Sequence, residues 1–142
     1  MRIYIGAVGR IRERNWLALM DEYSTRLSHY VKCDVTEFKD NQELLRQPPQ
    51  GDVIVALEVA GARLTSTQFA QTLEAWSRRG RGRTAFIIGG ADGIPTAISQ
   101  SAHHRLSLSD MTLPHRLARL FLLEQLYRAF TILRGEPYAR ES

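Results

Sequence analysis

Cysteine and long apolar runs are the features that this 142-residue sequence has least of. Cys33 is the single cysteine, which excludes an internal disulfide and any zinc or iron–sulfur site built from several thiolates. No apolar stretch approaches the roughly 20 residues that cross a bilayer, and the opening segment MRIYIGAVGR has too short an apolar run for a signal sequence. The sequence therefore predicts a soluble cytoplasmic protein without a metal site.

The sequence also lacks any segment that would divide it. No stretch rich in proline, glycine or serine interrupts the chain, so residues 1–142 are predicted to form a single domain. Apolar residues make up 44% of the chain and charged residues 24%, a balance typical of a folded globular protein. The net charge of +4 favours a polyanionic partner, of which the phosphate backbone of a nucleic acid is the commonest.

Strand-like and helix-like patterns alternate along the chain. Apolar, β-rich runs predict strands at Ile3–Val8, Asp34–Phe38, Val53–Val59, Thr84–Ile88 and Arg105–Leu108. Helical spacing predicts helices at Trp16–Leu27, from Ser66 or Thr67 toward Gly80, at Pro95–His104 and at Pro114–Leu133. This order predicts an α/β fold in which a mainly parallel sheet is covered by helices on both faces. Ligands are expected beyond the carboxyl ends of the strands.

The last predicted helix is apolar nearly all round. Its apolar residues fall on two opposite sides: Leu117, Leu120 and Phe121 on one, and Leu122, Leu126, Phe130 and Leu133 on the other. One side can cover the sheet of its own chain, but a chain of this length has little left to bury the other. A second copy, meeting the first across a two-fold axis, is the economical explanation, and a helix enclosed within one chain is the alternative.

A glycine-rich turn follows the fourth predicted strand. Its glycines, Gly89, Gly90 and Gly93, have the spacing GGxxG. This spacing matches neither the Walker pattern, which needs a lysine, nor the GxGxxG dinucleotide fingerprint. Taken alone, the pattern indicates an ordinary tight turn more than a cofactor loop.

The segment 106–115, LSLSDMTLPH, is rich in hydroxyls and apolar side chains yet leads into the most apolar helix. Such a loop suits a ligand with an adenine ring and a thioether. Its backbone amides and carbonyls can read the adenine edge, while Met111, Leu113 and Leu57 pack against the ring faces. The alternative is a buried connection whose polar groups are satisfied by its own Ser107, Ser109 and Thr112.

Four motifs in order carry a resemblance to a known family. They are IGGADG at 88–93, LSLSDMTLPH at 106–115, EQLYRA at 124–129 and PYARE at 137–141. The sequence resembles the RlmH family of the SPOUT superfamily, whose members methylate N3 of a pseudouridine in 23S ribosomal RNA. The likeness runs from the first strand to the last residues.

The resemblance implies a SPOUT fold with a C-terminal trefoil knot and S-adenosylmethionine as cofactor. It also implies a homodimer whose active site uses both chains, with assembled ribosomes as the substrate. Carried over motif by motif, the cofactor contacts fall on Leu57, Gly90, Ser109, Asp110, Met111, Thr112, Leu113 and Pro114. The candidate catalytic residues are His115, Arg128, Tyr138 and Arg140. Arg128 or Arg140 would stabilise the developing anion, His115 or Glu141 would accept a proton, and water is an alternative base.

This chain departs from the family at two places. Ala139 stands where members commonly have a histidine, and Lys39–Arg46 is shorter and more mixed in charge than their lysine-rich segment. Ala139 keeps open a second function, an RNA-binding module without transfer activity, and the GGxxG loop keeps open a third, an α/β protein that binds a nucleotide phosphate.

Two charged features also allow two interpretations. Glu124 and Arg128 form either a simple helix ion pair or part of a buried site. The arginines at 78, 79, 81 and 83 form either a solvated turn or an RNA contact.

Overall fold

The structure, a computed structural model, describes residues 1–141 apart from the side chain of Glu141, so Ser142 lies outside the described residues. Its strands are β1 (Arg2–Val8), β2 (Lys32–Phe38), β3 (Val53–Arg63), β4 (Arg83–Ile88) and β5 (His104–Ser107). They form one sheet in the order β2-β1-β4-β3-β5, and every neighbouring pair is parallel. The parallel sheet predicted from the sequence is confirmed.

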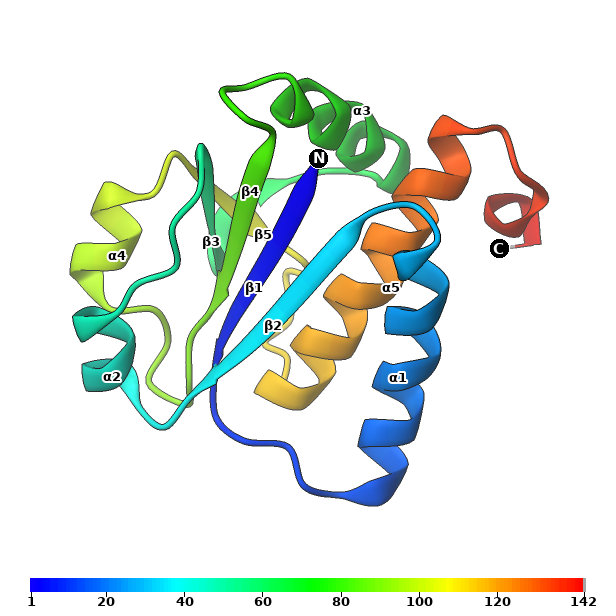
Figure 1. Ribbon diagram of the computed structural model, residues 1–142. Coiled ribbons are helices and arrows are strands. Elements are labelled where there is room, and N and C mark those ends of the chain that lie inside the picture. Colours follow the sequence, from blue (N-terminus) through cyan, green and yellow to red (C-terminus); the bar gives the residue numbers. More distant parts are fainter. Residues whose placement is uncertain (142) are drawn as a thin grey trace.

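The helices are α1 (Arg14–Ser28), α2 (Asn41–Arg46), α3 (Ser66–Ser77), α4 (Thr96–Ser101) and α5 (His115–Leu133), followed by the short 3-10 helix η1 (Pro137–Glu141). Helices α1, α3 and α5 pack on one face of the sheet, and α2 and α4 cover the other (Figure 1). Alternation along the strands produces the two cores, because Phe86 and Ile88 pack on the first side and Ile87 on the second. Helices on both faces are confirmed as well.

Several predicted boundaries are wrong for identifiable reasons. Helix α3 is capped by Thr65, one or two residues before the predicted Ser66 or Thr67, because Thr65 and Gln68 exchange backbone and side-chain hydrogen bonds in a capping box. Helix α4 ends at Ser101, since the next residues pass into β5. Helix α2 was not predicted, because it is only six residues long.

The two apolar sides of α5 lie in different surroundings. Leu122, Leu123 and Leu126 are at most 1% exposed and form part of the core beneath the sheet. Leu117 on the opposite side is 37% exposed, and Phe121 is only partly buried. One chain therefore covers one side of α5 and leaves the other half-covered. The trefoil knot implied by the resemblance stays a prediction.

Asp52 ties the beginning of β3 to the beginning of β4. Its carboxylate accepts hydrogen bonds from the Arg83 guanidinium and from the backbone amides of Arg83 and Arg81, at 3.1–3.3 Å. The Arg83 side chain first, and then these amides, lower the pKa of Asp52 to about 2. The carboxylate therefore stabilises the fold fully above about pH 4, and this contribution is lost as the pH falls toward 2.

We expect Asp52→Asn to lower the melting temperature near neutral pH by an amount that shrinks once the pH falls below about 4. Thermal unfolding of both proteins, followed by circular dichroism from about pH 7 to about pH 3, measures the difference. A deficit that stays constant over the whole range would contradict the assigned role of the carboxylate.

Candidate cofactor pocket

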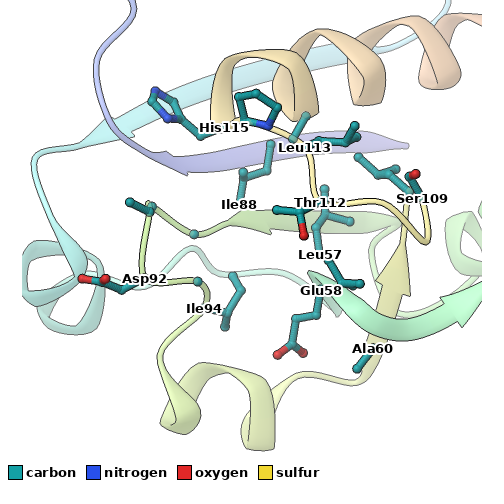
Figure 2. A pocket seen from close by; sticks show the side chains of 18 of the residues that line it. Leu57, Glu58, Ala60, Ile88, Asp92, Ile94, Ser109, Thr112, Leu113 and His115 are labelled. Atoms are coloured by element: carbon teal, nitrogen blue, oxygen red, sulfur yellow. The ribbon is translucent and has the colours of Figure 1, made fainter.

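A cavity of about 780 Å³ opens at the carboxyl ends of the neighbouring strands β4, β3 and β5 (Figure 2). This volume is typical of small-molecule and cofactor sites. Three stretches of chain line it, at Leu57–Ala60 in β3, at Ile88–Ile94 after β4 and within Leu108–His115 after β5. It lies at the edge of the sheet where ligands were expected from the sequence.

A bulge in β3 forms one wall. Strand β3 pairs with β5 in one register up to Leu57 and in another from Ala62. Gly61 allows the two strands to meet there, because a Cβ atom on it would lie 2.7 Å from the backbone of Arg105 and Leu106. The sequence predicted that this strand ends at Val59, which is wrong: β3 continues to Arg63, and Leu57 lies where its register changes.

The glycine turn forms the second wall. Gly93 donates its amide hydrogen to the carbonyl of Gly90 at 2.9 Å, and the two residues form an antiparallel bridge. The side chain of Asn41 from α2 donates to the carbonyl of Gly93 at 3.3 Å. The segment is thus an ordinary tight turn and also a wall of the cavity, so the two interpretations of GGxxG describe the same element.

The loop before α5 forms the third wall. The Ser107 hydroxyl donates to the carbonyl of Ser109 at 2.9 Å, and the Ser109 hydroxyl accepts from the amide of Met111 at 3.0 Å. The loop therefore satisfies some of its own polar groups, as the alternative interpretation expected. Its backbone and apolar side chains nevertheless line the cavity, and Met111 is 79% exposed.

Most of the predicted cofactor residues lie together around this cavity. They are Leu57, Gly90, Ser109, Met111, Thr112, Leu113 and Pro114, with His115 at the margin. Asp110 is not among the lining residues, and its carboxylate instead accepts a 2.7 Å hydrogen bond from Arg63.

Sequence reasoning missed Glu58, which also lines the cavity. Its carboxylate accepts a 2.8 Å hydrogen bond from Ser99 of α4. The only signal for it was its place next to Leu57, and a regular strand would direct neighbouring side chains to opposite faces.

Residues 1–139 match the family described as "Predicted SPOUT methyltransferase". The chain belongs to the SPOUT methyltransferase family. A relative from Sorangium cellulosum is 50% identical over 98% of this chain and 99% of its own length, and one from Acetivibrio thermocellus is 39% identical over 99% and 100%. Both are named Ribosomal RNA large subunit methyltransferase H.

Solved structures show the same fold at low sequence identity. A methylase-family protein of Haemophilus influenzae Rd KW20 superposes with a TM-score of 0.60 and 10% identity, over 96% of this chain and 69% of its own. A Legionella pneumophila protein solved with the cofactor SAM superposes with a TM-score of 0.54 and 11% identity, over 91% and 66%. Membership of the SPOUT family makes this chain an S-adenosylmethionine-dependent methyltransferase.

In this SPOUT methyltransferase, an ion pair between the buried Arg119 and the more exposed Glu37 holds the first turns of α5 against the sheet. Arg119 is 4% exposed and donates to the Glu37 carboxylate at 2.6 Å and to the carbonyl of Gly9 at 2.9 Å. Burial on its own raises the pKa of Glu37, but the hydrogen bonds from Arg119 and the Ile11 amide outweigh it and lower that pKa. His115 lies one turn earlier, with its ring against Gly9 at the margin of the cavity.

The other candidate catalytic residues lie at the far end of α5 (Figure 1). Arg128 donates to the Glu124 carboxylate at 2.8 Å, and the Tyr138 hydroxyl donates to the same oxygen at 2.7 Å. The helix ion pair predicted as one interpretation is thus present and extends to the tail. Arg140 is exposed and donates to the carbonyl of Gly135 at 3.1 Å.

The tail forms a short element of its own after α5. Residues 137–141 form η1, because the Tyr138 ring packs edge-on against Tyr127 at 4.6 Å in addition to its bond with Glu124. Burial first, and then the hydrogen bond to Glu124, raise the pKa of Tyr138. Tyr138 therefore keeps its proton near neutral pH in this arrangement.

No helix among residues 1–141 is long and apolar enough to cross a membrane. The same described residues contain no cluster of His, Cys, Asp and Glu that would hold a metal ion.

Proposed function

We propose that this SPOUT methyltransferase transfers a methyl group from S-adenosylmethionine to N3 of a pseudouridine in 23S ribosomal RNA, on assembled ribosomes. The observation that carries the proposal is the 50% identity, over nearly the full length of both chains, to a relative named Ribosomal RNA large subunit methyltransferase H. The resemblance of the motifs at 88–93, 106–115 and 137–141 supports the finer assignment of the base and atom.

We assign the cofactor to the cavity at the carboxyl ends of β3, β4 and β5. Leu57, Ile88 and Leu113 offer apolar surface for an adenine ring, and the backbone of 109–114 and of Gly90 offers hydrogen-bond partners for its edge. Asp110 is assigned to the loop's attachment to Arg63 rather than to ligand contact. These groups fit the adenosine part of the cofactor.

The bound cofactor supplies a methyl group carried on a sulfonium. The chain must hold the acceptor nitrogen in line with that methyl group and accommodate the loss of the N3 proton. We assign stabilisation of the resulting anion to Arg140, because its guanidinium is exposed, whereas the charge of Arg128 is already offset by Glu124. His115 is the candidate proton acceptor at the cavity margin, and Tyr138, which keeps its proton, is assigned to positioning.

The distance between cavity and tail supports a homodimer. His115 and Arg128 lie 13 residues apart on one helix, which corresponds to about 20 Å along its axis. The tail follows Arg128, so its side chains cannot reach the cavity of their own chain unless the tail gives up the η1 conformation. We propose that the tail serves the partner's cavity, and that the half-covered side of α5 with Leu117 and Phe121 forms the interface.

We further propose that residues 1–142 act as one domain in the cytoplasm, where ribosomes are found. The functional test is incubation of purified protein with labelled S-adenosylmethionine and either assembled ribosomes or free ribosomal RNA, followed by mapping of the methylated base. Label at N3 of a pseudouridine is expected with ribosomes. Cofactor binding without transfer to either substrate would favour the RNA-binding module instead.

Cofactor binding gives a separate prediction. S-adenosylmethionine or its demethylated product, at about 100 times its dissociation constant, should raise the melting temperature by roughly 5–10 °C. ATP and NAD should have no such effect. Thr112→Trp should abolish the shift by filling the cavity from an exposed loop, whereas Thr67→Trp, exposed on α3, should retain it. A shift with ATP alone would favour the phosphate-binding alternative.

A further inference from the structure

The turn between α3 and β4 carries a dense group of arginines at the end of the molecule opposite the cavity. It contains Arg78, Arg79 and Arg81 and leads into Arg83, the first residue of β4 (Figure 1). Because all strands are parallel, this turn lies at the edge formed by their amino-terminal ends, whereas the cavity lies at their carboxyl ends. Nothing in the proposed cofactor site uses these side chains.

The acidic residues beside the turn are already paired with two of the arginines. Arg83 forms an ion pair with Asp52 at 3.1 Å, and Arg78 pairs with Glu74 at 3.2 Å. Arg79 and Arg81 are exposed and form no salt bridge with any residue in the described part of the chain. The local surplus of positive charge therefore resides on these two side chains.

The backbone of the turn is fixed. The amide of Arg81 donates to the Asp52 carboxylate at 3.1 Å, and the amide of Gly82 donates to the carbonyl of Arg79 at 2.8 Å. Gly80 has a φ of +53° and lies so close to Asp52 that a Cβ atom would collide with its carboxylate. The turn thus presents Arg79 and Arg81 from an ordered backbone, which lowers the entropic cost of binding a ligand.

Further basic and hydrogen-bonding groups extend the same edge. Arg2 and Lys32 begin the adjacent strands β1 and β2. Arg2 forms an ion pair with Asp34. His103 accepts a hydrogen bond from the amide of Ile54 through Nδ1, which leaves its Nε2 to act as a donor. His104 stacks on Trp76 beside the turn, with 5.0 Å between the rings. The edge suits a polyanion longer than a single phosphate.

We propose that Arg79 and Arg81 form a second RNA contact, which binds the phosphate backbone of ribosomal RNA away from the nucleotide that is methylated. The inference rests on the proposed ribosomal RNA substrate. Two guanidiniums whose Cα atoms are at most about 7 Å apart can reach neighbouring phosphates of one strand. Such contacts fix the position of the enzyme on the RNA and carry no base specificity.

The test compares three double variants with the wild type. Arg79→Glu with Arg81→Glu reverses the charge of the turn, and Arg79→Lys with Arg81→Lys preserves it. Lys39→Glu with Arg46→Glu makes the same change in net charge at exposed residues near α2, outside this edge. Binding to ribosomes is measured at several salt concentrations, together with S-adenosylmethionine affinity and melting temperature.

The glutamate variant of the turn should bind ribosomes about 10- to 100-fold more weakly, with a salt dependence whose log–log slope is smaller by about 2. Its cofactor affinity and melting temperature should match those of the wild type. The lysine variant should stay within a few-fold of the wild type, because an ammonium still neutralises a phosphate.

Equal losses in the turn variant and the Lys39/Arg46 control would overturn the proposal, since they would indicate a general effect of net charge. An unchanged salt slope in the turn variant, with wild-type methylation, would overturn it as well. A wild-type protein that methylates neither ribosomes nor free RNA would instead refute the proposed function.

Discussion

Deletion of residues 137–142 is expected to reduce methyl transfer to ribosomes at least about a hundredfold while leaving the fold and cofactor binding in place. The cavity is lined without the tail, so S-adenosylmethionine should bind nearly as well. The deletion removes Tyr138 and Arg140 but leaves the ion pair between Glu124 and Arg128 on the helix. Initial rates with labelled cofactor, and melting temperatures with and without it, measure both effects.

Point variants refine this expectation. Arg140→Ala should reproduce most of the rate loss, because the exposed guanidinium is the group assigned to the developing anion. Ala139→His should leave the rate equal or higher, since it restores the residue common in the family at that place. An undiminished rate in the truncated protein would remove the tail from the mechanism and direct attention to His115 and Arg119.

A mixing experiment separates a shared site from a site within one chain. The truncated chain and the Thr112→Trp chain should each be inactive, the first lacking the tail and the second lacking the cavity. When the two chains are coexpressed with different tags, half of the dimers should contain one chain of each kind. Each mixed dimer contains one complete site out of two, so about a quarter of wild-type activity should return. Mixed dimers that recover no activity would show that the tail acts on its own chain.

The second large effect concerns the two sides of α5. The sequence placed Phe121 and Leu126 on opposite sides of this helix, and Leu126, which is 0% exposed, lies in the chain's own core. Leu126→Asp should therefore unfold the protein, because an unpaired buried charge costs about 3–5 kcal/mol. Phe121→Asp should leave a folded monomer that has lost methyl transfer.

Light scattering distinguishes these outcomes. The wild type should have about twice the 16.2 kDa mass of one chain, and Phe121→Asp should have about the mass of a single chain. Circular dichroism should show a cooperative transition for Phe121→Asp and none for Leu126→Asp. A wild-type monomer that methylates ribosomes, or a Phe121→Asp dimer, would refute the assigned interface.

Local patterns predicted the sheet and most of its covering helices because such patterns depend on neighbouring residues, whereas most of the cavity residues were predicted from the resemblance to the family. Alternation at Phe86–Ile88 and the helical repeat in 115–133 each reflect a single element. The contact of Arg119 with Glu37 joins residues 82 positions apart, and no local pattern in the sequence specifies it. The extension of β3 past Val59 depends in the same way on the close approach of Gly61 to β5.

The ion pair between Glu124 and Arg128 illustrates the limit at the candidate site. Its spacing was visible in the sequence, and the structure contains it. The tyrosine that completes the group belongs to the tail, 14 residues from Glu124, and joins it only because the chain turns back after α5. The order of the motifs indicated that the segments 124–129 and 137–141 both matter, but only the fold shows that they are in contact.

Helix α5 also fixes the distance between the cavity margin and the tail, and the rotation of one relative to the other about the helix axis. It begins at the margin of the cavity and ends shortly before the tail, with an unbroken helix of 19 residues between them. One residue added to a helix rotates everything beyond it by about 100° and moves it by about 1.5 Å. An insertion within α5 would therefore turn the tail away from its target even if every functional side chain remained. The proposed shared site therefore requires a fixed length of α5 as well as the residues at its two ends.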